Sequence, residues 1–153
     1  QFRPMVPITI DVHNFAALAT QDDPVAWVQA VTLYRAPFGE GAYLNDAPEL
    51  ENWLLREQER WQQHVVHLLD RLIVWYTAKA AYGAALHYAR RLVALEPWCE
   101  EAHCQIMWLL ARTGQISAAL AQYRRCRQAL WTELAVEPTA TTQALYANLQ
   151  AMP

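Results

Sequence analysis

The chain has 153 residues, of which 54% are hydrophobic and only 18% are charged, and this balance excludes an intrinsically disordered protein. A net charge of −3 argues against a nucleic-acid-binding domain, because such domains usually carry a basic patch or stripe. Three cysteines without framework spacing argue against a disulfide scaffold and favour a reducing, cytoplasmic compartment, and no apolar run reaches the length of a membrane span.

The first ten residues are expected to be extended, because their prolines disfavour helix. Within them, Ile8, Thr9 and Ile10 are candidates for the last strand of a preceding domain. Since the chain begins with Gln1 rather than Met, we expect it to be a segment of a longer protein.

Two short helices are predicted next. Asp11 can cap a helix that runs to about Thr20. A second helix is expected to start at Asp22, Asp23 and Pro24, capping residues followed by proline in the first turn, and to stop ahead of Pro37. A loop over residues 36–47 follows.

The rest of the sequence has the apolar periodicity of five further helices. They are expected over about residues 48–81, 83–95, 100–112, 115–134 and 140–150. Gly114 is placed to end one of them in the left-handed conformation, and Thr139 is placed to cap the last.

The segment from Leu69 to Tyr123 nearly repeats itself with a period of 34 residues, the spacing between Tyr82 and Ile116. Two helical patterns repeated at this period are typical of tetratricopeptide repeats. The second copy overruns, because Trp131 stands at the equivalent of the closing proline of the first copy. We therefore expect an all-α fold, a tetratricopeptide-like right-handed stack of about seven antiparallel helices.

In tetratricopeptide geometry the first helix of each pair lines a concave groove. This places Trp108 in the groove beside acidic and His groups, and a Trp anchor with a polar rim is the composition of a protein-binding surface. The alternative is that the C-terminal helix covers Trp108. The candidate groove residues are His67, Asp70, Val74, Thr77, Glu101, Cys104, Trp108 and Ala111.

No metal site is predicted. Cys99 and His103 share a helix face, but Cys104 points about 100° away from His103. No fourth ligand stands nearby in the sequence, whereas zinc sites usually show paired ligand knuckles. We interpret the three residues as packing at repeat positions.

No catalytic or cofactor site is predicted either. His64, His67 and Asp70 lie on one face of a predicted helix, but no second carboxylate set accompanies them, and we interpret them as a polar wall. With only four glycines the chain has no Gly-rich phosphate loop. An enzyme would have to use these three residues.

Five stretches of the chain have the residues of one known family, in the same order. They are residues 33–41, 49–57, 89–92, 100–103 and 133–138. Over about residues 11–150 the chain resembles the bacterial transcriptional activator domain of SARP-type regulators. It departs from the family pattern at Ala36 and Ala135, where Gly is commoner, and at Ala140, where Pro usually follows the helix cap.

The resemblance implies a tetratricopeptide-like module that follows an OmpR-type winged-helix DNA-binding domain. Residues 1–10 would be the trailing segment of that absent domain, and residues 11–150 the activator domain. The module would act without catalysis or cofactors, through protein contacts with a second copy of itself, the transcription machinery or adjacent domains. DNA would be contacted only by the separate winged helix, and no membrane contact is expected.

An alternative function is a sensor module. In that case the groove would bind a small ligand or a peptide and regulate a linked DNA-binding or ATPase domain.

Overall fold

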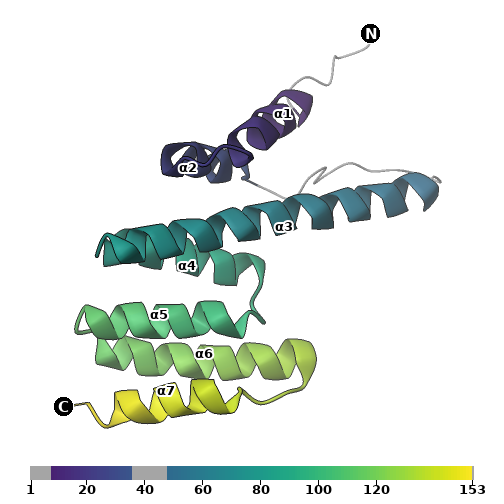
Figure 1. Ribbon diagram of the computed structural model, residues 1–153. Coiled ribbons are helices and arrows are strands. Elements are labelled where there is room, and N and C mark those ends of the chain that lie inside the picture. Colours follow the sequence, from purple (N-terminus) through teal and green to yellow (C-terminus); the bar gives the residue numbers. More distant parts are fainter. Residues whose placement is uncertain (1–7, 36–47, 153) are drawn as a thin grey trace. The chain divides into compact units, whose positions relative to one another are not determined.

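The computed structural model describes residues 8–35 and 48–152, with side chains from residue 13 onward, and this part of the chain is all-α (Figure 1). Its helices are α1 (Ile8–Ala19), α2 (Pro24–Leu33), α3 (Pro48–Ala78), α4 (Tyr82–Leu95), α5 (Glu100–Arg112), α6 (Ile116–Leu134) and α7 (Ala140–Gln150). The predicted fold class of about seven helices is thus confirmed. No described helix combines the length and the apolar character that crossing a bilayer requires. The loop predicted at 36–47 lies outside the described residues.

Helix α1 begins earlier than the sequence suggested. Ile8, Thr9 and Ile10 form its first turn, so the expectation that they are extended and end a strand is wrong. A proline restricts itself and the residue before it, but it leaves the following residues free to enter a helix. Asp11 consequently lies inside the helix rather than at its N-cap.

The chain divides into two compact units, Gln1–Leu68 and Leu69–Pro153. In the first unit, α1 packs against α2. The carboxylate of Asp23 caps α2 as predicted, accepting a hydrogen bond of 3.1 Å from the backbone N–H of Val25. Trp27 is buried, and its indole N–H donates to the carbonyl of Gln21 at 2.7 Å, which ties α2 to the turn before it.

The first unit also includes the N-terminal part of α3, which reaches α1 through an aromatic contact. The buried ring of Phe15 meets Trp61 edge-on, with 5.7 Å between ring centroids. Edge-to-face pairs of this kind add about 0.5–1.5 kcal/mol beyond the burial of area.

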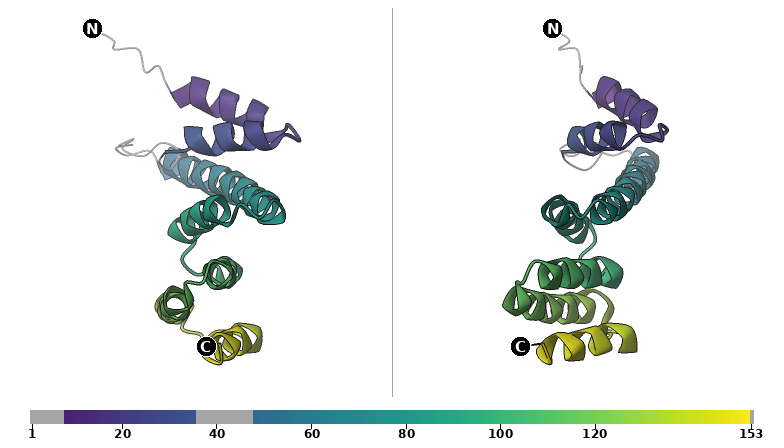
Figure 2. Two further views of the ribbon diagram at one scale, coloured as in Figure 1. Left: turned by 90° about the vertical axis from the view of Figure 1, so that its left-hand side faces the viewer. Right: turned by 60° about the vertical axis from the view of Figure 1, so that its left-hand side comes forward.

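In the second unit, α4 packs against α5, α5 against α6, and α7 against both α5 and α6 (Figure 1 and Figure 2). The predicted repeat is visible in its core. Ala85 and Ala119 occupy equivalent positions and are both fully buried. Leu72 and Ile106 are a second equivalent pair, and neither side chain is more than 1% exposed. Small alanines let paired helices approach closely, while the large residues fill the space between pairs.

Equivalent helix ends in the two repeats have the same backbone geometry. At the end of α5, Gly114 has φ 75°, and Gln115 N–H donates to the carbonyl of Leu110 at 2.8 Å. At the end of α3, Ala80 has φ 55°, and Ala81 N–H donates to the carbonyl of Tyr76 at 2.9 Å. Both are left-handed caps, as predicted for Gly114, but Ala80 bears the steric cost of a side chain.

The overrun of the second repeat is also confirmed. Helix α4 ends at Leu95, whose equivalent is Ala129, yet α6 continues to Leu134. It ends on Ala135, which is left-handed with φ 54°. This is one of the positions at which the chain departs from the pattern of the family that it resembles.

Replacing Ala80 by Gly should raise the free energy of unfolding by about 0.5–1 kcal/mol, because glycine adopts a positive φ without steric strain. The reciprocal change Gly114→Ala should lower it by a similar amount, since an added Cβ meets no atom within 4 Å and backbone strain alone decides the outcome. Urea unfolding followed by circular dichroism measures both. A lower midpoint for Ala80→Gly would contradict the left-handed geometry.

Candidate functional site

Three side chains from α4 and α5 form a group that we call the Trp108 cluster: half-buried Tyr82 and exposed Trp108 and Arg112. The rings of Tyr82 and Trp108 meet edge-on at 5.9 Å between centroids. The Arg112 guanidinium carbon lies 5.5 Å from the centroid of Trp108 and 5.7 Å from that of Tyr82. One guanidinium nitrogen donates to the Tyr82 hydroxyl at 3.3 Å.

Trp108 remains 41% exposed, so the alternative that the C-terminal helix covers it is wrong. Its ring contacts the first residue of α4 instead. Arg112 stands one turn further along α5, and cation–π contacts at such exposed sites contribute about 0.5–1 kcal/mol each. The cluster is therefore a fixed aromatic surface that is open to solvent.

Two members of the cluster belong to a longer line of residues along α5, the α5 stripe, whose members are Glu101, Gln105, Trp108 and Arg112. The spacing of i, i+4, i+7 and i+11 puts them on one helix face. Glu101 is exposed, and the Oε1 atom of Gln105 is buried without a hydrogen-bond partner among the described residues. The stripe thus carries an acid at one end, a guanidinium at the other, and an aromatic ring between them.

The predicted groove residues differ in their exposure. Five of them are exposed: His67, Asp70, Val74, Glu101 and Trp108. Three are half-buried: Thr77, Cys104 and Ala111.

Four of the predicted groove residues share helix α5, and one of them also contacts α7. The Cys104 sulfur lies 3.1 Å from the Thr142 hydroxyl. His67 belongs to the first compact unit, whereas the other seven belong to the second.

Sequence reasoning missed two members of the Trp108 cluster. Arg112 follows Trp108 by four residues, and that spacing on a helix was a sufficient signal. The contact with Tyr82 depends on the turn after Ala80, which the sequence pattern does not specify. The repeat alignment merely paired Tyr82 with Ile116.

His103 is 2% exposed and has partners at both ring nitrogens. Its Nε2 lies 2.9 Å from the carbonyl of Pro97, and the side-chain amide of Gln122 lies 2.7 Å from its Nδ1. Burial lowers the pKa of His103, against the raising effects of the Pro97 carbonyl and of Glu100. A neutral ring bonded on both sides joins α5 to α6 and has no nitrogen left for a metal.

The three residues of the predicted polar wall, His64, His67 and Asp70, are side chains of α3. His64 is exposed, its Nδ1 lies 2.7 Å from the carbonyl of Arg60, and its ring rests near Trp61 at 5.6 Å between centroids. His67 and Asp70 are also exposed.

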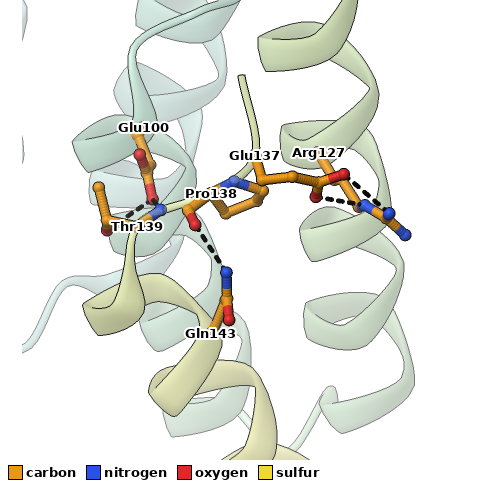
Figure 3. A network of polar contacts seen from close by, with 6 residues as sticks. All are labelled: Glu100, Arg127, Glu137, Pro138, Thr139 and Gln143. Atoms are coloured by element: carbon orange, nitrogen blue, oxygen red, sulfur yellow. Dashed lines mark hydrogen bonds and ion pairs between the residues drawn. The ribbon is translucent and has the colours of Figure 1, made fainter. Parts of the chain in front are cut away.

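A carboxylate of α5 holds the start of α7 (Figure 3). Glu100 Oε1 accepts hydrogen bonds from the backbone N–H of Thr139 at 2.7 Å and from its hydroxyl at 2.8 Å. Burial raises the pKa of Glu100, but the hydrogen bonds from Thr142 and Thr139 outweigh it, and the pKa is lowered overall. Thr139 also caps α7 by accepting from the N–H of Thr142, as predicted.

The loop before α7 has a second polar contact, between Arg127 and Glu137. The guanidinium donates to both carboxylate oxygens, at 2.7 and 2.9 Å (Figure 3). Both side chains are exposed, so this pair adds less to stability than its geometry suggests. Between these contacts lies buried Pro138, whose carbonyl accepts from the Gln143 amide at 2.8 Å.

An open depression of about 600 Å³ lies in the first unit. Its lining comes from α1 and α2: Asn14, Ala17, Leu18, Val28, Gln29, Thr32 and Leu33. It contains no charged group, so its chemistry does not select a ligand.

The model of one protein family, the bacterial transcriptional activator domain, matches residues 11–150, nearly the whole chain. No curated protein and no solved structure matches the chain.

Removing the carboxylate with Glu100→Ala should lower the free energy of unfolding by about 1–2 kcal/mol, because two hydrogen bonds to a charged acceptor are lost. The loss should be concentrated in α7, which hydrogen–deuterium exchange measures as faster exchange of its amides. Glu101→Ala is the matched control, since Glu101 is exposed in the same helical turn. Equal effects of the two changes would contradict the assignment.

Acidification should destabilise the second unit through His103. Its pKa in the folded chain is below the unfolded value of about 6.5, so the unfolded state binds the proton more tightly. The contribution is fully present above about pH 6.5 and is lost as the pH falls through the folded pKa. Unfolding free energies measured from pH 7 to 5 should fall less steeply in His103→Gln than in the wild type. His67→Gln, at an exposed position of the first unit, is the matched control.

Proposed function

The chain belongs to the family of bacterial transcriptional activator domains, and we propose that it is a protein-interaction module of a bacterial transcriptional regulator. The family consists of non-catalytic regulatory domains. In this proposal the module works by contact alone, in the cytoplasm, without a cofactor. In the same proposal, residues 11–150 are the activator domain, and residues 1–10 are the last segment of a preceding winged-helix domain that contacts DNA.

The Trp108 cluster is the observation that carries this proposal. Trp, Tyr and Arg are the three residue types most enriched in the energetic centres of protein interfaces. Here they contact one another while Trp108 stays 41% exposed. Because the rings and the guanidinium already hold one another in place, a partner would lose little side-chain entropy by docking on them.

The partner surface in this proposal extends from the Trp108 cluster over the predicted groove. Its polar rim includes exposed Asp70 and Glu101, and Val74 adds apolar surface at 63% exposure. Thr77, Cys104 and Ala111 complete the set within the second unit. The occupant is a second copy, the transcription machinery or an adjacent domain of the same regulator.

Replacing Trp108 by Ala should weaken partner binding about 30-fold or more, as expected for truncation of an interface hot spot. Self-association is measured by analytical ultracentrifugation, and binding to RNA polymerase by biolayer interferometry. Helicity by circular dichroism should be unchanged, because Trp108 is 41% exposed.

Trp131→Ala is the matched control, because Trp131 is 59% exposed on α6, outside the α5 stripe. Its binding should equal that of the wild type. Unfolding of Trp108→Ala would show that the residue is core. Loss of binding in Trp131→Ala alone would move the interface to α6.

A further inference from the structure

We propose that the α5 stripe recognises an extended peptide segment. The acidic residue of this peptide binds Arg112, a large apolar residue packs on Trp108, and a basic residue binds Glu101. This inference rests on the proposed function and specifies the chemistry of the partner at the same surface.

Arg112 supplies the site for the acidic residue. Its guanidinium has five N–H donors, of which the Tyr82 hydroxyl takes one. Arg60 and Arg127 form ion pairs with Glu57 and Glu137, whereas no carboxylate among the described residues lies within ion-pair distance of Arg112. A planar guanidinium held against two rings is pre-organised to bind a carboxylate with two parallel hydrogen bonds.

Trp108 supplies the apolar contact. Covering its exposed part would remove aromatic surface from water, and each square ångström of apolar area buried contributes about 25 cal/mol. The edge-on contact with Tyr82 fixes the orientation of the ring, so an apolar side chain of the partner meets one defined face.

Glu101 sets the other end of the motif. It lies eleven positions before Arg112, or roughly 16 Å along a helix axis at 1.5 Å per residue. An extended peptide advances about 3.3 Å per residue, so about five residues cover that distance. The basic residue is therefore expected about five positions from the acidic one, with the apolar residue about two positions from the acidic one.

A peptide fits this surface better than a nucleic acid does. An aromatic ring beside an arginine can stack on a base and bind a phosphate. A phosphate backbone running along the stripe would, however, meet the carboxylate of Glu101, on a chain whose net charge is −3. The acidic end of the stripe complements a basic side chain, which only the peptide provides.

The test starts from a randomised nine-residue peptide display library selected against the complete chain. Enriched peptides should carry Asp or Glu about two positions from a large apolar residue and about five from Lys or Arg. Failure to enrich any peptide, or enrichment of peptides without an acidic residue, would overturn the proposal.

A charge exchange then tests the role of Arg112. Fluorescence polarisation compares one selected peptide with its variant in which Lys replaces the acidic residue. The wild-type chain should prefer the acidic peptide by roughly tenfold, and Arg112→Glu should reverse that preference. An unchanged preference in Arg112→Glu would refute the proposal. Tighter binding of a single-stranded oligonucleotide than of the peptide by the wild-type chain would also refute it.

The outcome also separates this inference from the proposed function. If Trp108→Ala abolishes binding to RNA polymerase or to a second copy while Arg112→Glu leaves it intact, the interaction module stands and the charged motif is wrong. If neither variant changes the binding, both the interaction module and the charged motif are wrong.

Discussion

The close packing of paired helices at two buried alanines is the constraint on which the second unit depends. Ala85 and Ala119 are fully buried at equivalent repeat positions, and a larger side chain at either would separate the helices. This packing buries the apolar side of α5, where Ala102, Ile106 and Leu110 lie. Its opposite side is therefore free to present the α5 stripe, and the core and the proposed site are two faces of one helix.

Helix α5 is also the element to which its neighbours are attached by specific polar and aromatic contacts. His103 joins it to Gln122 of α6, Glu100 joins it to Thr139 before α7, and Trp108 joins it to the start of α4. One of the five stretches that resemble the family, residues 133–138, has a structural role here. It ends α6 and brings Thr139 within reach of Glu100.

Sequence reasoning located most helix boundaries because capping chemistry is local. Asp23, Gly114 and Thr139 each signal a helix end through their own conformational preference, and all three occupy those roles. Ile8 was misjudged because upstream prolines constrain preceding residues and not following ones. The exposure of Trp108 stayed open, because it depends on how α4 and α7 approach α5, which is a property of tertiary packing. Tyr82 was missed for the same reason.

The left-handed backbone of Ala135 can be relieved by a single mutation. Alanine and glycine codons differ by one nucleotide, so a single substitution would relieve the backbone cost at the end of α6. The change would leave every side chain of the α5 stripe in place. Stability at this edge and the proposed recognition at the stripe could therefore be selected separately.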